Sequence, residues 1–457
     1  MNGENEETIN ITHTIDARPF TAFQIGAIAL CALVAFLDGI DSQSIAIAAP
    51  LIAEKLGLVR TALGPLFSAA VLGATIGALT FGPLGDHFGR KRCLIAATVT
   101  FGIFTLLTAY VASYQMMLIV RFAAGIGLGG ATPCFIALAS EYAPQRRRAM
   151  IASLIWAGFP LGGMVGGFAN SYILVSFGWP AIFLVGGILP LAIAAILSLW
   201  LPESIRFLLA KGGSGDTVRA IVRRILPEAG PKALIVADEE HISGIRVKYL
   251  FSEGRAVGTL LLWVPFMMAF GTLLVVVVWT PALLRINGIA PSQGAVVLGF
   301  HGLGALIGMA SAGRLMERFG TVATLVPAFI LGTLATGALG YAATSVTSMS
   351  VVIALVGVFV GMGASGSIAL AALTYPTAIR STGVGWAMGM GRFGQVIAPL
   401  TTSLMLGAGW SIVQIFLATA AAPFIAAVFI LLLKRHAGRA AAATAVVASP
   451  SPTPTVP

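Results

Sequence analysis

Charged side chains are scarce in this sequence of 457 residues. Lys, Arg, Asp and Glu make up only 10% of it, and 58% of the residues are hydrophobic, whereas a soluble globular protein carries about 25% charged residues. This composition excludes an ordinary soluble domain and indicates a membrane protein. The formal net charge of +10 does not indicate binding to nucleic acid, because the basic residues lie in loops between apolar runs.

Groups suited to catalysis or metal binding are also few. The three cysteines lie in or beside apolar segments without metal-ligand spacing, and four of the five histidines lie in polar stretches or loops. A membrane-embedded hydrolase would need a nucleophile with its base, or a metal cluster. We therefore predict that the protein is not an enzyme and holds no metal or other cofactor. A transporter-like receptor stays open, although the tail and central loop contain no obvious signalling module.

Long apolar runs are abundant. Twelve of them are about 20 to 29 residues long, enough for a helix to cross a bilayer. They cover residues 22–50, 61–83, 93–112, 115–139, 150–175, 178–201, 258–286, 293–312, 321–343, 348–374, 381–406 and 409–433. We predict an all-α integral membrane protein with twelve transmembrane helices. The polar start of the chain indicates no cleavable signal peptide ahead of the first span.

One long polar stretch divides the spans into two sets of six. The predicted organisation is an N-terminal segment (1–21), an N-terminal six-helix half (22–201), a central loop (202–257), a C-terminal six-helix half (258–433) and a disordered Ala/Ser/Thr/Pro-rich tail (434–457).

The loop charges predict the orientation. Basic triplets at 90–92 and 146–148, the central loop and the segment after the last span all fall on one side of the membrane. The opposite side carries only three basic residues, Lys55, Arg60 and Arg285. Because cytoplasmic loops are enriched in Lys and Arg, we predict that both termini are cytoplasmic.

The two halves resemble each other in sequence. GPLGDHFGRKR at 82–92 matches GRLMERFGTVA at 313–323, and EYAPQRRR at 141–148 matches TYPTAIRS at 374–381 at nearly the same offset. Two matches at equivalent span ends indicate duplicated halves with pseudo-symmetry. In transporters of this plan the substrate site lies near the membrane midplane, between the halves.

These motifs resemble the major facilitator superfamily. The loop motif at 82–92, RFAAGIG at 121–127 and PESIRFLL at 202–209 follow its patterns, with a departure at His87, where the superfamily usually has Arg. DGID at 38–41 and YPTAIRSTGVGWAMGMGRFG at 375–394 resemble the aromatic acid:proton symporter family of bacteria. That resemblance implies import of hydroxybenzoates, protocatechuate, gentisate or related carboxylates across the inner membrane. It also implies that the aspartate motif is required for transport.

Asp38 and Asp41 lie in the middle of the first span, where one aspartate costs on the order of 3 kcal/mol. Three residues apart, they share one side of a helix, and two carboxylates so close cannot both stay ionised cheaply in a low dielectric. Such a group can take up and release the proton of a coupled carrier. The alternative is that they pair with a basic residue and brace the bundle. Ser42 adds a polar group toward the cavity.

Intramembrane cations are few. Arg392, midway along the eleventh span, suits the carboxylate of a substrate, to which a guanidinium can donate two parallel hydrogen bonds. Its alternative is a permanent ion pair with Asp38 or Asp41. Arg121 in the fourth span is a candidate for proton relay, with packing or snorkelling as the alternative.

Two further residues are candidates for contacts with the substrate. His301, in the eighth span, can hydrogen-bond a ring hydroxyl or carry a proton, although a lone histidine is often a satisfied core residue. Trp386, about two turns before Arg392, is the best single candidate for stacking on an aromatic ring, although most aromatic residues here pack or face lipid.

Charged residues at the cytoplasmic span ends form another class. We expect them to latch the halves in one conformation and to separate in the other, with surface salt bridges of little consequence as the alternative. These conformational gating candidates are Asp86, Arg90, Glu141, Glu317 and Arg380.

The sequence therefore predicts a secondary transporter of the bacterial inner membrane that functions as a monomer. Its partners are a small aromatic carboxylate, protons and the lipid bilayer. A nicotinate-like acid or a sugar are alternative substrates. Export by proton antiport is a further alternative, because GFPLGGMVGG at 158–167 partly follows an antiporter pattern, with the proline displaced to Pro160.

Overall fold

The computed structural model describes residues 8–211, 215–228, 234–236, 246–252, 255–375 and 379–448. Within them lie twelve helices of 19 residues or more. These are α2 (Ala22–Lys55), α3 (Leu63–Phe88), α4 (Arg90–Thr108), α5 (Tyr114–Glu141), α6 (Arg148–Phe177), α7 (Trp179–Trp200), α10 (Ala256–Ile286), α11 (Pro291–Phe319), α12 (Thr321–Ala342), α13 (Val346–Thr374), α14 (Arg380–Gly407) and α15 (Ile412–Ala448). The predicted all-helical class and the twelve helices are confirmed.

Eleven of the helices in the described residues are long and apolar enough to cross a membrane. The twelfth, α14, has 28 residues and lies in the bundle against α3 and α10. Several helices run beyond the predicted apolar stretches. Helix α2, for example, passes through Pro50 and ends at Lys55, because the polar residues of its last turn can leave the hydrocarbon region.

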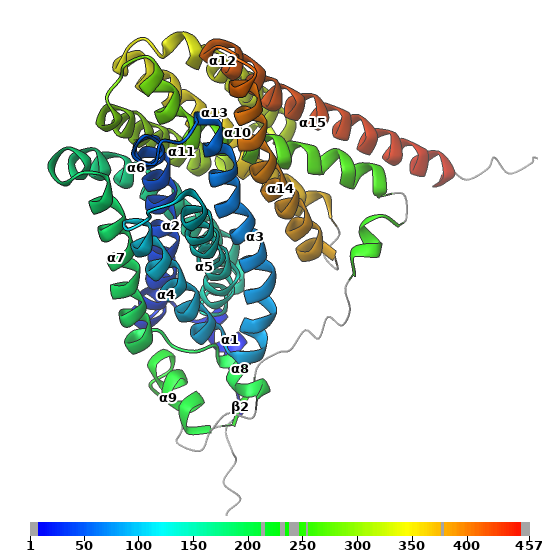
Figure 1. Ribbon diagram of the computed structural model, residues 1–457. Helices are drawn as coiled ribbons and strands as arrows, with labels where there is room; N and C mark the ends of the chain where they lie inside the picture. The colour runs from blue at the N-terminus through cyan, green and yellow to red at the C-terminus, as the bar shows by residue number, and fades with distance from the viewer. Residues whose placement is uncertain are drawn as a thin grey trace, which may run out of the picture.

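Helices α2–α7 and α10–α15 form two groups with the same internal packing. In the first group α2 packs on α6, α3 on α5 and α4 on α7. In the second, α10 packs on α14, α11 on α13 and α12 on α15. Figure 1 shows the two groups as the blue-to-green and the light-green-to-red parts of the molecule. This repeated packing agrees with duplicated halves.

Small residues allow these helices to approach closely. A Cβ at Gly77 of α3 would overlap the carbonyl oxygen of Ile126 on α5, and a Cβ at Gly129 of α5 would overlap that of Ala74 on α3. Close packing of this kind, rather than a hydrophobic driving force, holds helices together in lipid. It explains why so many glycines lie within apolar runs.

The halves meet along α6 and α11, α3 and α14, and α2 and α10. We call the end at which α2 and α10 begin the termini end, and the end at which they finish the far end. Toward the far end, Ser403 Oγ donates to the Thr61 carbonyl (2.6 Å) and Ser68 Oγ to the Val396 carbonyl (2.7 Å). Toward the termini end, α3 and α14 diverge (Figure 1), and a Cβ at Gly385 would have no neighbour within 4 Å. The two halves are therefore bonded to each other toward the far end, whereas α3 and α14 lie apart toward the termini end.

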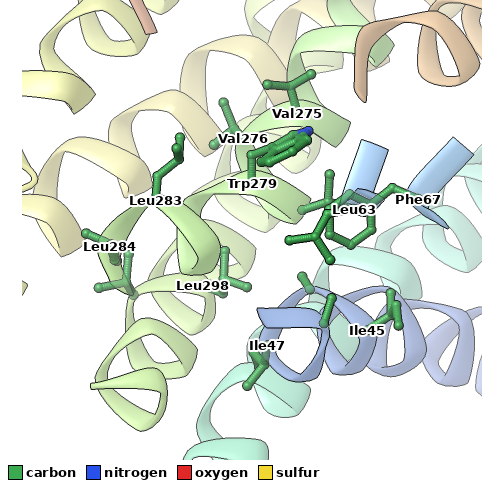
Figure 2. Close-up of a cluster of buried hydrophobic side chains, with 14 of the residues drawn as sticks. Ile45, Ile47, Leu63, Phe67, Val275, Val276, Trp279, Leu283, Leu284 and Leu298 are labelled. Atoms are coloured by element: carbon green, nitrogen blue, oxygen red, sulfur yellow. The ribbon is translucent and has the colours of Figure 1, made fainter. Parts of the chain in front are cut away.

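An apolar cluster from both halves fills the far end. Figure 2 shows Trp279 of α10 beside Leu63 and Phe67 of α3, with Ile45 and Ile47 of α2 nearby. The Trp279 and Phe67 rings meet edge to face, with centroids 5.8 Å apart, and the Trp279 side chain has 0% exposure. This cluster seals the far end of the interface between the halves.

Short elements make up the described parts of the N-terminal segment and the central loop. They are β1 (Thr8–Asn10), α1 (Ile11–Ala17), α8 (Ile205–Ala210), α9 (Gly215–Ile225), β2 (Leu234–Val236) and η3 (Arg246–Leu250). Two further short helices, η1 (Arg60–Ala62) and η2 (Gln145–Arg147), connect α2 to α3 and α5 to α6. Strands β1 and β2 pair in parallel, and α9 buries Val218, Val222 and Ile225 in the core of the first half. Much of the predicted polar loop is therefore folded.

An ion pair supports this attachment. Arg18 donates to both Glu228 oxygens, at 2.9 and 3.3 Å, and this bond lowers the pKa of the Glu228 carboxyl. The bond is therefore present at neutral pH and is lost only as the pH falls through the lowered pKa of Glu228. Both side chains are exposed, so water and salt screen the interaction.

The predicted disordered tail from Lys434 is wrong over its first part. Helix α15 continues to Ala448 as a single helix. The reason is composition, because the run from Ala440 to Ala443 consists of alanine, the residue with the highest helix propensity. Residues 449–457 of the predicted tail lie outside the described residues.

Candidate functional site

Asp41 forms a buried ion pair at the centre of the first half. Arg121 of α5 donates from Nη2 to Asp41 Oδ2 at 2.5 Å and from Nη1 to Oδ1 at 3.3 Å. The Asp41 side chain is 2% exposed and that of Arg121 is 1% exposed. This two-point contact satisfies both carboxylate oxygens and supplies the partner that each residue needs inside a membrane.

Two neighbouring helices complete the surroundings of this pair. Thr105 of α4 donates from Oγ1 to Asp41 Oδ1 at 3.2 Å, and the Phe183 ring of α7 lies 5.9 Å from the Arg121 guanidinium carbon. The pair therefore fixes α2, α4, α5 and α7 relative to one another. Neither Thr105 nor Phe183 follows from the sequence, because only the folded bundle brings their helices to Asp41.

Asp38 has different surroundings, although it lies less than one helical turn away. It is only partly buried, and among the described residues it makes no hydrogen bond or ion pair. It interacts electrostatically with Arg392 of α14 and with Asp41. Arg392 is likewise partly buried and interacts with Asp38 across the interface of the halves without a direct bond in the described structure. The permanent ion pair between Arg392 and an aspartate is therefore not formed in this conformation.

Helix packing holds α2 in this position. A Cβ at Gly39, between the two aspartates, would overlap the Phe159 carbonyl oxygen of α6, and one at Gly162 would overlap the Phe36 carbonyl oxygen of α2. The two backbones are thus in contact at the level of the aspartates. Glycine at position 39 lets α2 turn its acidic face toward the other helices.

A polar group continues along α2 after the aspartates. Ser42 is partly buried, whereas Ser44 Oγ donates to the Ile40 carbonyl (2.8 Å) and accepts from Asn170 Nδ2 of α6 (3.0 Å). Gln43 is 3% exposed, and its Oε1 has no partner in the described structure. Gln43 thus joins Ser42 and Ser44 in this polar group on α2.

His301 lies in α11 on the other side of α6. Its side chain is 5% exposed, and Nε2 has no partner in the described structure. Gly163 of α6 lies between Gln43 of α2 and the part of α11 that carries His301. A Cβ at Gly163 would meet Gln43, and a Cβ at Gly302, the residue after His301, would meet Gly163. Two buried, unpaired polar groups, Gln43 Oε1 and His301 Nε2, thus lie on either side of the same stretch of α6. Leaving such groups unpaired costs about 1–3 kcal/mol each, so they can bond a ligand.

Trp386 lies nearer the termini end. Its side chain is 45% exposed, and its ring stacks on Trp263 of α10 with centroids 6.0 Å apart and planes 15° from parallel. The structure therefore places Trp386 against Trp263 of α10 and not against the aspartates.

The gating candidates fall into two groups. Arg90 bonds Asp86 at 3.2 Å and forms an ion pair with Glu141, so these three residues come together at the termini end of the first half. Glu317 is exposed on α11, and Arg380 Nε donates to the Tyr375 carbonyl at 3.5 Å. The structure thus unites the members from the first half and leaves those of the second half apart from them.

Glu203 joins this first-half cluster, although the sequence did not single it out. Its Oε1 accepts from the backbone N–H of Lys91 (2.9 Å) and of Ser204 (3.0 Å). The Tyr142 hydroxyl donates to the Glu203 carbonyl at 2.8 Å. The motif PESIRFLL at 202–209 is the sequence signal that could have identified this residue. Its glutamate, Glu203, caps the start of α4 beside Arg90.

Comparisons with known proteins identify the family. The model of the Major Facilitator Superfamily matches residues 31–353 and 261–455. The chain belongs to the major facilitator superfamily. It is 33% identical over 429 residues to the 4-hydroxybenzoate transporter PcaK of Pseudomonas aeruginosa, covering 93% of this chain and 96% of the relative. It is 32% identical to the gallate transporter of Pseudomonas putida over 93% of this chain and 94% of that one.

A solved structure shows the same fold. The xylose transporter XylE from E. coli, in a partially occluded inward open conformation, matches with a TM-score of 0.71 over 90% of this chain and 98% of its own, at 17% identity. The relatives and this neighbour are transporters and not enzymes, so the chain is a transporter of this superfamily. The predicted superfamily and fold are confirmed.

Proposed function

We propose that this protein imports a small aromatic carboxylate across the bacterial inner membrane by proton symport and alternating access. Relatives at 32–33% identity that are named transporters of 4-hydroxybenzoate and gallate support the substrate class. The basic loops support an orientation with both termini in the cytoplasm. In this orientation the hydrogen bonds that join α3 and η1 to α14 lie toward the periplasmic end, and the divergence of α3 and α14 faces the cytoplasm. The proton is the only coupling species we invoke, with no other cofactor.

The observation that carries the proposal is the different bonding of the two aspartates. Asp41 has both oxygens bound, by Arg121 and Thr105, whereas Asp38 is unbonded and interacts electrostatically with Arg392. A substrate carboxylate that binds Arg392 by two hydrogen bonds neutralises the cation next to Asp38. Asp38 then carries a second negative charge beside that carboxylate and takes up a proton. Asp41 and Arg121 keep the helix in place throughout.

The remaining site residues fit the rest of an aromatic acid. A ring hydroxyl can bond the unpaired Gln43 Oε1 or His301 Nε2, and Ser42 adds a further polar group on α2. Trp386, on the open path toward the termini end, can stack on the ring during release. Specificity among aromatic acids then depends on which ring positions carry hydroxyl groups.

We also propose a role for the clusters at the termini end. When this end closes, Glu317 and Arg380 of the second half approach Asp86, Arg90 and Glu141 of the first half. Opposite charges from the two halves then stabilise the conformation that opens to the periplasm. All site residues lie within one chain, so a monomer is sufficient for transport.

The test is uptake into proteoliposomes with an imposed inward proton gradient. The panel is 4-hydroxybenzoate, gallate, gentisate, nicotinate and glucose, each radiolabelled, with collapse of the gradient by an uncoupler as the control. We expect gradient-driven accumulation of at least one aromatic acid by the wild type and loss of that accumulation in Arg392→Ala. Accumulation of glucose alone, or accumulation driven only by an outward gradient, would contradict the proposal.

A further inference from the structure

The charged residues at the far end are concentrated in one place. Glu54 and Lys55 end α2, Arg60 begins η1 and Arg285 lies in the last turn of α10. The other connectors at this end, all of them described, contain no charged residue. Three cations and one anion thus surround the point where α2 and α10 meet. An excess of positive charge at one mouth raises the local concentration of anions.

A cavity of about 340 Å³ opens between these residues. Glu54, Arg60 and Arg285 line it together with Trp279, and its apolar wall includes Leu58 and Ala282. It has contributions from both halves, because α2 and η1 belong to the first and α10 to the second. Its volume lies within the range of about 300–1,000 Å³ that is typical of small-molecule sites.

The polar groups of the cavity are only partly satisfied. The Arg285 guanidinium forms an ion pair with Glu54, which joins the two halves at this end. Arg60 is exposed, and its guanidinium makes no hydrogen bond or ion pair within the described structure. Trp279 is completely buried, and its Nε1 has no partner among the described residues. Two guanidinium groups and an apolar wall match a planar ring that carries a carboxylate.

We propose that this cavity is an outer binding site for the carboxylate substrate. The incoming carboxylate bonds Arg60 and displaces Glu54 from Arg285. One carboxylate replaces another at Arg285, so this cation keeps a partner, and the substrate takes the place of Glu54 between the two halves. A neutral analogue cannot make this exchange. The assignment of substrate and sidedness rests on the proposed function above.

Protection of a single cysteine from labelling tests the site directly. Ala282 lines the cavity and is partly exposed, so Ala282→Cys is introduced after the three native cysteines are replaced by serine. The variant also carries Arg392→Ala, which removes the central substrate contact. N-Ethylmaleimide labelling is followed in proteoliposomes with 4-hydroxybenzoate or the neutral 4-hydroxybenzamide. At ten times its dissociation constant the acid should slow labelling about tenfold, because only the free fraction reacts, and the amide should not.

Two charge-removing variants provide the matched comparison. Arg60→Gln should abolish the protection. Lys55→Gln removes the same charge nearby but should preserve it, because the Lys55 ammonium lies over the Trp179 ring, 5.2 Å from its centroid, and does not line the cavity. Equal protection by acid and amide, no protection, or equal effects of the two variants would overturn the site. If the wild type transports the acid and protection is absent, only the outer site fails. If protection occurs without transport, only the proposed function fails.

Discussion

At the scale of single residues, the two aspartates of α2 divide the tasks of stability and coupling. Asp41 is buried and bonded to Arg121, and Asp38 is partly exposed and unbonded. The sequence predicted the pair and its place in the membrane. It did not reveal which aspartate would bind a cation, because the partner lies 80 residues away on α5. Only the packing of α2 against α5 decides that Asp41, and not Asp38, faces Arg121.

Asp41→Asn should destabilise the fold. The substitution leaves Arg121 as a buried cation with a neutral partner, and breaking a buried ion pair costs about 3–5 kcal/mol. We expect a clearly lower Tm in detergent than for Asp38→Asn, which removes a carboxylate without a bonded cation. Equal Tm values for the two variants would contradict the assignment of Asp41 as the bracing residue.

Arg392→Lys should separate charge from geometry. Lysine keeps the positive charge but cannot donate two parallel hydrogen bonds to a carboxylate. We expect a KM for the transported acid at least about tenfold higher, the equivalent of roughly 1.4 kcal/mol, and a Tm close to that of the wild type. The measurement is the concentration dependence of uptake. An unchanged KM would show that Arg392 does not hold the substrate carboxylate.

At the scale of helices, the sequence predicted which membrane helices exist and their order better than it predicted where each helix begins and ends. Hydrophobic length was sufficient to find the twelve spans. It was not sufficient for α9, whose Val218, Val222 and Ile225 have the i, i+4, i+7 spacing of a buried helical face within a charged segment. It also did not show that Glu203 would cap α4, since that contact joins residues 112 positions apart.

The contact between α2 and α6 offers a test within one helix. Gly39→Ala forces a methyl group against the α6 backbone, and overpacking of this kind costs about 1–3 kcal/mol. Gly26→Ala on the same helix meets no atom within 4 Å and is the control. We expect reduced folded yield and Tm for Gly39→Ala and no loss for Gly26→Ala, measured by size-exclusion chromatography and thermal unfolding. Similar behaviour of both variants would refute this close packing.

At the scale of the whole molecule, the two halves and the unbonded carboxylate of Asp38 determine the energetics of transport. One carboxylate anion that enters with one proton moves no net charge. Only the pH gradient then drives uptake, about 1.4 kcal/mol or tenfold accumulation per pH unit. A second proton would add about 2.3 kcal/mol per 100 mV of membrane potential.

We therefore predict electroneutral transport. In proteoliposomes, a potassium diffusion potential of about 100 mV set by valinomycin, at equal pH on both sides, should not drive accumulation of the acid. A pH gradient without a potential should drive it. Accumulation driven by the potential alone would show that Asp41 or another group carries a second proton.

The central claim is that Asp38 exchanges the coupling proton, and counterflow compared with gradient-driven uptake in Asp38→Asn tests it most directly. Asparagine resembles the protonated carboxyl, so the variant should still exchange radiolabelled acid against unlabelled acid across the membrane. It should no longer accumulate the acid in response to an inward proton gradient. Retained gradient-driven accumulation by Asp38→Asn, or loss of counterflow together with accumulation in a correctly folded variant, would contradict the account.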